Sequence, residues 1–272
     1  MSPKIISVVT GASGFVGSHL VDRLISEGHH VKCILRKSSS LRWLKNKPVE
    51  IINCGLFDKE ALKNVLKDAD YLFHVAGVVK AKTNEEYYQG NVETTKVLLD
   101  VVSEVNPGIK RVVIVSSQTA CGPSLDGVPC TEETKEHPIT RYGKSKLAQE
   151  QMAKSYSDRL PISIIRAVAV YGPRDTEIYL VFKTYKQGLL GLIGFNKKLV
   201  NIIHVTDLVD GIYFAAITEK AIGQTYFIGS QECNFPIDGK ESTYCPCSAY
   251  NSIYCCGNCT IFCSLQFKSG NI

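Results

Sequence analysis

Three residues in the middle of the chain have types and spacing suited to proton transfer. Tyr142 and Lys146 are four positions apart, so on a helix they share one face. A free tyrosine has a pKa of about 10 and carries protons poorly at neutral pH. A neighbouring ammonium stabilises the phenolate and lowers that pKa. Ser117 follows an apolar run, and its hydroxyl could hold a substrate oxygen beside the tyrosine.

A glycine-rich turn near the N-terminus indicates a nucleotide site. The sequence TGASGFVG at residues 10–17 follows an apolar run, 5–9, and opens onto an amphipathic helical pattern ending near Gly28. In that context Gly11 permits a tight turn, Gly14 lets the backbone approach a pyrophosphate, and Gly17 lets helix and strand pack closely. Amides at the helix start would face the phosphates. The alternative is a glycine-rich turn with no ligand.

The next two strands refine the cofactor prediction. Residues 31–35 read as a strand that ends at Arg36, where an acidic residue would accept hydrogen bonds from a ribose 2′-hydroxyl. A guanidinium suits a 2′-phosphate instead, so NADP is favoured over NAD, although Arg36 could also be a solvated side chain. Another strand, 71–75, ends at Ala76 and Gly77, whose small size lets a cofactor cross the sheet edge. We interpret His74 as a core histidine.

These motifs require a sheet whose strands alternate with helices. The sequence predicts a doubly wound parallel α/β sheet, the Rossmann architecture, because such crossovers are right-handed and cover both faces. One long helix is expected through residues 92–102, and Asp58 is expected to cap the helix after the third strand. The six predicted strands of this part are 5–9, 31–35, 49–54, 71–75, 111–115 and 162–165.

In combination, the motifs resemble the extended short-chain dehydrogenase/reductases of the NAD-dependent epimerase/dehydratase group. The matching segments cover about residues 4–230. They are TGASGFVG at 10–17, HVAG at 74–77, NVETTKVLL at 91–99, VSSQTACGPS at 115–124, YGKSK at 142–146, VYGPRDTE at 170–177 and IHVTDLVDGI at 203–212.

The resemblance assigns roles to these residues. It implies Tyr142 as acid/base, Lys146 as its pKa partner and ribose contact, and Ser117 as the ligand of the substrate hydroxyl. The cofactor contacts expected from motif and resemblance together are Gly11, Ser13, Gly14, Phe15, Val16, Gly17, Arg36, Leu56, Ala76, Gly77, Tyr142 and Lys146.

Two departures from the family pattern bear on the reaction. Gly55 stands where an Asp often reaches the adenine, so Leu56 and backbone groups are left to line that pocket. Gln118 and Thr119 follow Ser117 where sugar-nucleotide dehydratases carry Asp-Glu, which disfavours elimination of water. Epimerisation, or net oxidation or reduction of an alcohol, remains. Arg36 and residues 120–124 look closer to the reductase-like and steroid-dehydrogenase-like branches.

Three segments are predicted: an NAD(P)-binding Rossmann domain at 1–170, whose core continues through interleaved segments, a partial substrate-binding lobe at 171–231, and an atypical tail at 232–272. In the lobe, Asp207 is expected to cap a helix over 208–217. Arg174 could contact an anionic substrate group, or could be an ordinary solvated loop residue.

The tail differs from the rest in composition, because it holds seven of the 11 cysteines. A metal site is disfavoured, since the cysteines lack two cleanly spaced pairs and the tail has no histidine. A disulfide framework fits poorly with a cytosolic enzyme. Our hypothesis is that the tail is non-native or disordered, with a reading-frame change as its origin, and that the substrate lobe is truncated.

Composition narrows the partners. The net charge of +5 is spread without a basic block, so nucleic acid is not expected. No apolar run is long enough for a membrane helix, and the start does not read as a signal peptide, so we expect a cytoplasmic protein.

We therefore predict an NAD(P)-dependent oxidoreductase or epimerase. It would act on a hydroxyl-bearing small molecule: a sugar nucleotide, or a dihydroflavonol- or steroid-like alcohol or ketone. The alternative is a non-catalytic dinucleotide sensor or regulatory protein. The sequence leaves the oligomeric state open, with a homodimer as one possibility because long helices of this fold often pair into a four-helix bundle between subunits.

Overall fold

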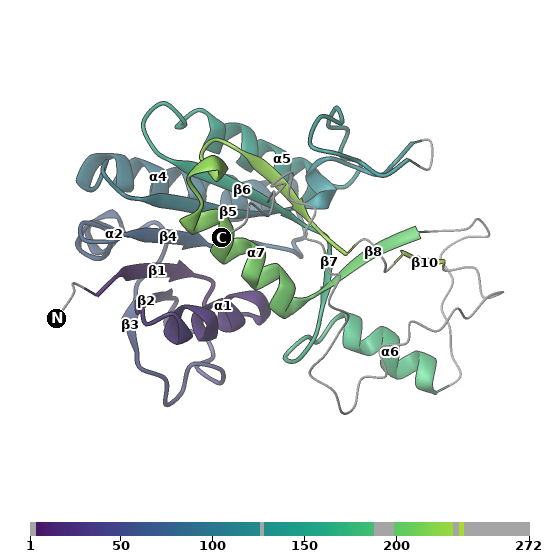
Figure 1. Ribbon diagram of the computed structural model, residues 1–272, viewed down its shortest axis with the longest axis horizontal. Coiled ribbons are helices and arrows are strands. Elements are labelled where there is room, and N and C mark those ends of the chain that lie inside the picture. Colours follow the sequence, from purple (N-terminus) through teal and green to yellow (C-terminus); the bar gives the residue numbers. More distant parts are fainter. Residues whose placement is uncertain (1–3, 126–127, 188–198, 231–233, 237–272) are drawn as a thin grey trace, which may run out of the picture. The chain divides into compact units, whose positions relative to one another are not determined.

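The computed structural model describes residues 4–125, 128–187, 199–230 and 234–236 (Figure 1). The chain divides into two compact units. The first contains residues 1–167 and 209–227, and the second contains 168–208 and 228–272. The segment 171–231, expected to form one lobe, therefore contributes to both units. Of the predicted tail, only Asn234–Pro236 is described, and the hypothesis about its origin falls outside the described residues.

A seven-stranded sheet with the order β3-β2-β1-β4-β5-β6-β9 forms the centre of the first unit. The pairs from β3 through β6 are all parallel. Strand order reverses beside β1, which is the doubly wound arrangement predicted from sequence. The bounds are β1 Ile6–Thr10, β2 His30–Leu35, β3 Val49–Asn53, β4 Tyr71–His74, β5 Arg111–Ser117, β6 Ile162–Ala167 and β9 Thr225–Ile228.

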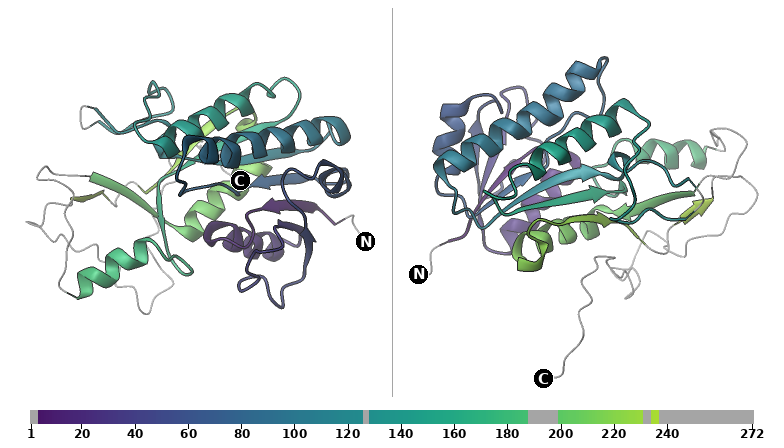
Figure 2. Two further views of the ribbon diagram at one scale, coloured as in Figure 1. Left: turned by 180° about the vertical axis from the view of Figure 1, so that it is seen from behind. Right: turned by 90° about the horizontal axis from the view of Figure 1, so that it is seen from above.

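Helices cover both faces of this sheet. Figure 2 shows α2 (Lys59–Leu66), α4 (Thr94–Val105) and α5 (Arg141–Lys154) on one face, with α1 (Phe15–Ser26) and α7 (Val205–Ile217) on the other. The central strands are consequently apolar on both sides: Val112, Val113 and Ile114 of β5 are all fully buried. Burial on both faces fixes the register of the strands, and thereby the positions of the residues at their carboxyl ends.

Helix α1 ends, and helix α2 begins, where the sequence predicts. The chain leaves α1 through Gly28, whose φ of +80° is in the left-handed region. Asp58 caps α2, because its side chain accepts a hydrogen bond from the Ala61 amide.

The predicted long helix through 92–102 has an irregular start. It is preceded by α3 (Asn84–Tyr88) and a π-helical turn at Gln89–Glu93, and only then continues as α4. The turn contains Gly90, where a Cβ would lie 2.3 Å from Val78 Cγ2. The extra residue per turn therefore accompanies a close contact with the loop after β4.

Two further boundaries differ from prediction. Strand β5 continues through Ser116 and Ser117, because its pairing with β6 extends to Ser117 and Ala167. Helix α7 begins at Val205, so Asp207 lies in its first turn and is not its N-cap. A carboxylate in that position still interacts favourably with the helix dipole.

The second unit contains a three-stranded sheet with the order β10-β8-β7. Strand β7 (Ala169–Tyr171) pairs parallel with β8 (Leu199–His204), and β10 (Asn234–Pro236) pairs antiparallel with β8. Helix α6 (Ile178–Lys186) lies between β7 and β8 in the chain. Within the described ranges, no helix combines the length and apolar character needed to cross a membrane.

Candidate active site

The glycine turn has the geometry that a bound dinucleotide requires. Gly11 has a φ of +72°, and a Cβ there would lie 2.6 Å from the Ala76 amide nitrogen. A Cβ on Gly17 would lie 2.1 Å from the Gly11 carbonyl oxygen. Both positions therefore exclude larger residues for steric reasons, one at the β1–β4 contact and one at the helix–turn contact.

The start of α1 leaves room for a phosphate. Its N-cap is Gly14, which has no side chain to accept a hydrogen bond from the helix amides. Gly14 itself is exposed, and its amide bonds the Gly11 carbonyl at 3.0 Å. Free amides at a helix N-terminus bind anions. This cradle fits the pyrophosphate of a nicotinamide dinucleotide.

A buried histidine joins the ends of β1 and β4. His74 contacts Thr10 Oγ1 through Nδ1 at 2.7 Å and Thr95 Oγ1 through Nε2 at 2.8 Å. Thr10 Oγ1 in turn accepts from the Ala76 amide at 3.2 Å. Burial lowers the pKa of His74 to about 3. His74 is thus a neutral core residue, as the sequence predicts, and it fixes the strand ends below the cofactor cradle.

Ser117, the last residue of β5, has a defined hydrogen-bonding direction. Its Oγ accepts from Thr119 Oγ1 at 3.0 Å and from the Thr119 amide at 3.3 Å. These two donors occupy the acceptor side of the hydroxyl, so its own proton is available to Tyr142 or to a substrate oxygen. Thr119 was not assigned a role from sequence. The serine-x-threonine spacing, typical of a side-chain turn, was the available signal.

Tyr142 enters the site from the first turn of α5. Thr140 caps this helix by accepting from the Gly143 amide at 2.9 Å. The Tyr142 side chain hydrogen-bonds Ser117, and its ring lies 6.2 Å from that of Tyr87. Burial raises the pKa of Tyr142, and the Ser117 hydrogen bond acts in the opposite direction. This net direction departs from the sequence expectation of a lowered tyrosine pKa.

Burial of the phenol is the main cause of this departure, and the lysine expected to oppose it hydrogen-bonds the backbone. Lys146 is 2% exposed, and its Nζ donates to the Val115 carbonyl at 2.8 Å. Burial lowers the pKa of Lys146 to about 8, while Glu150 acts to raise it. Lys146 also approaches the second small residue after β4, since a Cβ on Gly77 would lie 3.8 Å from its Nζ. The tyrosine, lysine and serine thus converge at the carboxyl edge of β5.

Asn91, the first residue of the segment NVETTKVLL, is a second residue whose role the sequence did not indicate. It is fully buried in the π-helical turn, and its Nδ2 donates to Ser145 Oγ at 2.9 Å. Its Oδ1 accepts from the Val78 amide at 2.7 Å, and Nδ2 also donates to the Val78 carbonyl at 3.1 Å. Asn91 therefore fixes the loop after β4 to α5, which places Gly77 beside Lys146.

The remaining predicted residues lie on other strands. Arg36 is exposed directly after β2, and Leu56 is partly buried after β3. Because β3, β2 and β1 are parallel neighbours, both residues lie at the same edge as the glycine turn. Ser13, Phe15 and Val16 are partly buried around the start of α1. Arg174 belongs to the second unit, where it follows β7 with a φ of +72°.

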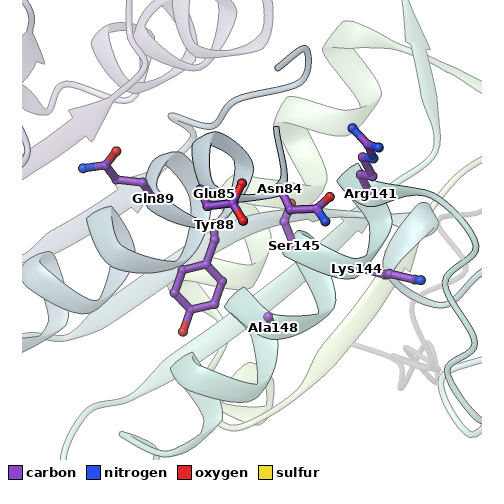
Figure 3. A pocket seen from close by; sticks show the side chains of 8 residues that line it. All are labelled: Asn84, Glu85, Tyr88, Gln89, Arg141, Lys144, Ser145 and Ala148. Carbon is purple, nitrogen blue, oxygen red and sulfur yellow. The ribbon is translucent and has the colours of Figure 1, made fainter. Parts of the chain in front are cut away.

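A separate hollow of about 670 Å³ lies between α3 and α5 (Figure 3). It contains neither Ser117, Tyr142 nor Lys146. Its lining comes from α3, the π-helical turn and α5: Asn84, Glu85, Tyr88, Gln89, Arg141, Lys144, Ser145 and Ala148. Tyr88 is 49% exposed.

The fold and these motifs define a Rossmann-type protein with a dinucleotide cradle and a Ser-Tyr-Lys cluster. A sequence model of the NAD dependent epimerase/dehydratase family matches residues 7–229, and the chain belongs to that family. A solved structure described as MoeE5 in complex with UDP-glucose and NAD is 28% identical. Its TM-score is 0.73, and the match covers 85% of this chain and 78% of that one.

Two curated relatives act on lipids according to their names. Sterol-4-alpha-carboxylate 3-dehydrogenase, decarboxylating, of Dictyostelium discoideum is 26% identical over 80% of this chain. Ceramide reductase of Caulobacter vibrioides is 28% identical over 74% of this chain. The matches span 69% and 58% of the lengths of these two relatives, respectively.

Proposed function

We propose that this protein is an NAD(P)-dependent oxidoreductase or epimerase that acts on a hydroxyl-bearing small molecule. The observation that carries the proposal is the convergence of Ser117, Tyr142 and Lys146 at the carboxyl edge of a sheet whose first turn forms a dinucleotide cradle. Ligands of such sheets bind at this edge. The bound nicotinamide would supply hydride acceptance or donation at C4.

The chain's own residues would bind the substrate oxygen and transfer its proton. Ser117, oriented by Thr119, would donate to the substrate oxygen, and Tyr142 would take or return the hydroxyl proton. Lys146 would contribute positive charge that favours the phenolate and would contact the nicotinamide ribose. In the ligand-free arrangement its ammonium bonds the Val115 carbonyl, so contact with the ribose requires that bond to be shared or exchanged.

Within this class, net oxidation or reduction of an alcohol is the favoured reaction. Gln118 and Thr119 follow Ser117, and Thr119 serves as a hydrogen-bond donor to it, so no acid pair is present there for elimination of water. The sterol dehydrogenase and ceramide reductase among the relatives support an alcohol or ketone on an apolar molecule. The similarity to MoeE5, which was solved with UDP-glucose and NAD, supports a sugar nucleotide as the second substrate class. Arg174 is proposed to bind an anionic group of such a substrate.

The cofactor proposal is NADP in preference to NAD. Arg36 follows β2 at the position where an acidic residue would instead select a ribose with a free 2′-hydroxyl. Titration with NADPH and NADH, followed by nicotinamide fluorescence, tests this choice. We expect tighter NADPH binding that is lost in Arg36→Ala and retained in the control Arg42→Ala. Equal or tighter NADH binding would refute the role of Arg36. Absence of binding to either nucleotide would refute the function itself.

Turnover with substrate panels then separates an enzyme from a dinucleotide sensor. Sterols and other secondary alcohols form one panel and UDP-sugars the other, with cofactor absorbance and product chromatography as readouts. Binding of cofactor without turnover in either panel would favour the sensor.

We also propose a homodimer that pairs through the face of α3 and α5. Its support is the hollow there and the exposed ring of Tyr88 (Figure 3). Light scattering should give twice the chain mass for the unaltered protein and the monomer mass for Tyr88→Arg. We also propose a cytoplasmic location; among the described residues, Cys33, Cys54, Cys121 and Cys130 are free thiols.

A further inference from the structure

A buried ion pair lies directly behind the Ser-Tyr-Lys cluster. Glu150 is 0% exposed and Arg166 is 1% exposed. Arg166 Nε donates to both Glu150 carboxylate oxygens at 3.1 Å, and Nη2 donates to Oε2 at 2.8 Å. A buried ion pair is often no more stabilising than an apolar pair of equal volume. Its placement therefore calls for an explanation beyond stability.

The pair connects the two elements that carry the cluster, α5 and β5, with the neighbouring strand β6. Glu150 follows Lys146 by one helical turn and Tyr142 by two, so the three side chains share one face of α5. Its Oε1 accepts from Ser116 Oγ at 2.5 Å, and Ser116 immediately precedes Ser117 in β5. Ser116 is also the register partner of Arg166 in β6.

We propose that Glu150 is a positioning residue of the site, whose carboxylate anchors the end of β5 through Ser116 and places a negative charge one helical turn from Lys146. This inference rests on the proposed function, in which Ser117, Tyr142 and Lys146 form the active site. Glu150 contacts neither substrate nor cofactor in this scheme. It acts through Lys146 and through the strand that carries Ser117.

The charge of Glu150 is not cancelled by its partner. Arg166 Nη2 also donates to Glu136, at 2.8 Å, so the guanidinium is shared between two carboxylates, and Lys154 acts on Glu136 as well. Cys121 is a further titratable group near Arg166, and burial raises its pKa to about 11, so it stays a neutral thiol.

Glu150 is the charged group that favours the Lys146 ammonium, and the Val115 carbonyl accepts a hydrogen bond from that ammonium. Burial lowers its pKa, and Glu150 is the group that raises it. His74 faces Lys146 from β4 and is neutral, and Tyr142 on α5 is a neutral phenol. Without the carboxylate, Lys146 would lose its proton at a lower pH and could no longer stabilise a phenolate.

The test is a titration of Lys146 that needs neither substrate nor cofactor. Lysine side chains labelled with ¹³C at Cε are followed by NMR against pH, and Lys146→Met assigns the signal. In Glu150→Gln we expect the Lys146 pKa to fall by about one unit or more, the size of an adjacent-charge effect. Glu136→Gln is the matched control. It removes a carboxylate from the same guanidinium, and it should lower the Lys146 pKa by less than half as much.

Two more variants guard against misfolding of Glu150→Gln. Glu150→Asp keeps the charge and should restore most of the Lys146 pKa. Ser116→Ala keeps every charge but removes the hydrogen bond between β5 and Glu150. This loss should weaken the hydrogen bond between Ser117 and Tyr142 and so raise the pKa of Tyr142, which is followed by NMR of ¹³Cζ-labelled tyrosine.

Two results would overturn the inference: an unchanged Lys146 pKa in folded Glu150→Gln, or equal falls in the Glu150 and Glu136 variants. If Glu150→Gln does not fold, an unchanged Tyr142 pKa in Ser116→Ala overturns it. Failure to bind NADPH and NADH would instead refute the proposed function, and the lysine titration would still decide the role of Glu150.

Discussion

At the scale of single residues, the site is defined by hydrogen-bond direction. Thr119 donates twice to Ser117, which leaves the serine proton for Tyr142 or for a substrate oxygen. Removal of the Thr119 hydroxyl would leave the Thr119 amide as the remaining one of these two donors, so Ser117 would be less firmly oriented. The roles of Thr119 and Tyr142 can therefore be separated, because one orients a group and the other exchanges the proton.

We expect Tyr142→Phe to abolish turnover, with at least a 10³-fold loss, while NADPH affinity changes less than about threefold, because only the proton carrier is removed. Thr119→Val should lower turnover by about tenfold, the cost of one hydrogen bond in orienting Ser117. Steady-state kinetics and fluorescence titration measure both. Retained turnover in Tyr142→Phe would exclude the assignment.

Glycine is required at residue 17 for a steric reason that can be measured. We expect Gly17→Ala to lower the free energy of unfolding by about 1–3 kcal/mol and to prevent dinucleotide binding, since a methyl group would overlap the Gly11 carbonyl. Gly108→Ala is the control, because nothing lies within 4 Å of a Cβ there. Its unfolding free energy should stay within about 0.5 kcal/mol of the unaltered chain. Urea denaturation compares the three proteins.

At the scale of helices and strands, sequence patterns predicted the elements better than their junctions. Strands β1–β6, α1 and the Asp58 cap were found because apolar periodicity and capping residues are local signals. The π-helical turn before α4 was missed, since it accompanies a contact between Gly90 and Val78 that sequence spacing does not reveal. The short strand β7 and the edge strand β9 of the seven-stranded sheet were also missed. Both depend on pairing with distant segments.

The same distinction applies to the candidate site. Tyr142, Lys146 and the glycines belong to motifs with fixed spacing, so they could be found without a structure. The direction of the Tyr142 pKa could not, because it depends on burial of the phenol and on the neighbouring Ser117 and Tyr87. Glu150 and Arg166 are 16 residues apart in the sequence, and only the fold shows that they meet behind Ser117.

The Asp58 cap gives a prediction at this scale. We expect Asp58→Ala to lower the unfolding free energy by about 0.5–2 kcal/mol, because the Ala61 amide would lose its partner at the start of α2. Asp68→Ala, an exposed position just beyond the end of α2, is the matched control and should change stability by less than about 0.5 kcal/mol. Equal losses in the two variants would contradict a capping effect.

At the scale of the whole molecule, buried histidines link stability to pH. The folded pKa of His74 is about 3, against 6.5 as the ordinary value, so the unfolded chain binds more protons between these limits. Stability from His74 is therefore complete above about pH 6.5 and decreases as pH falls. Burial also lowers the pKa of His29, which adds an effect of the same sign.

We expect the unfolding free energy to fall between pH 6.5 and 5 by up to about 1.4 kcal/mol per pH unit for each such histidine. In His74→Gln, which keeps hydrogen-bonding capacity without titrating, this slope should decrease by about half. His30→Gln is the control, because His30 is an exposed partner of Glu50. Denaturation at several pH values measures the slopes, and an unaltered slope in His74→Gln would contradict the linkage.

The return of residues 209–227 to the first unit has a consequence for synthesis on the ribosome. Strand β6 is complete once residue 167 has been made, but its outer neighbour β9 is encoded more than 50 residues later. During that interval the nascent chain presents β6 as an open, strongly apolar edge, of the kind that templates aggregation. The order of translation thus leaves this edge of β6 without its partner strand until β9 emerges.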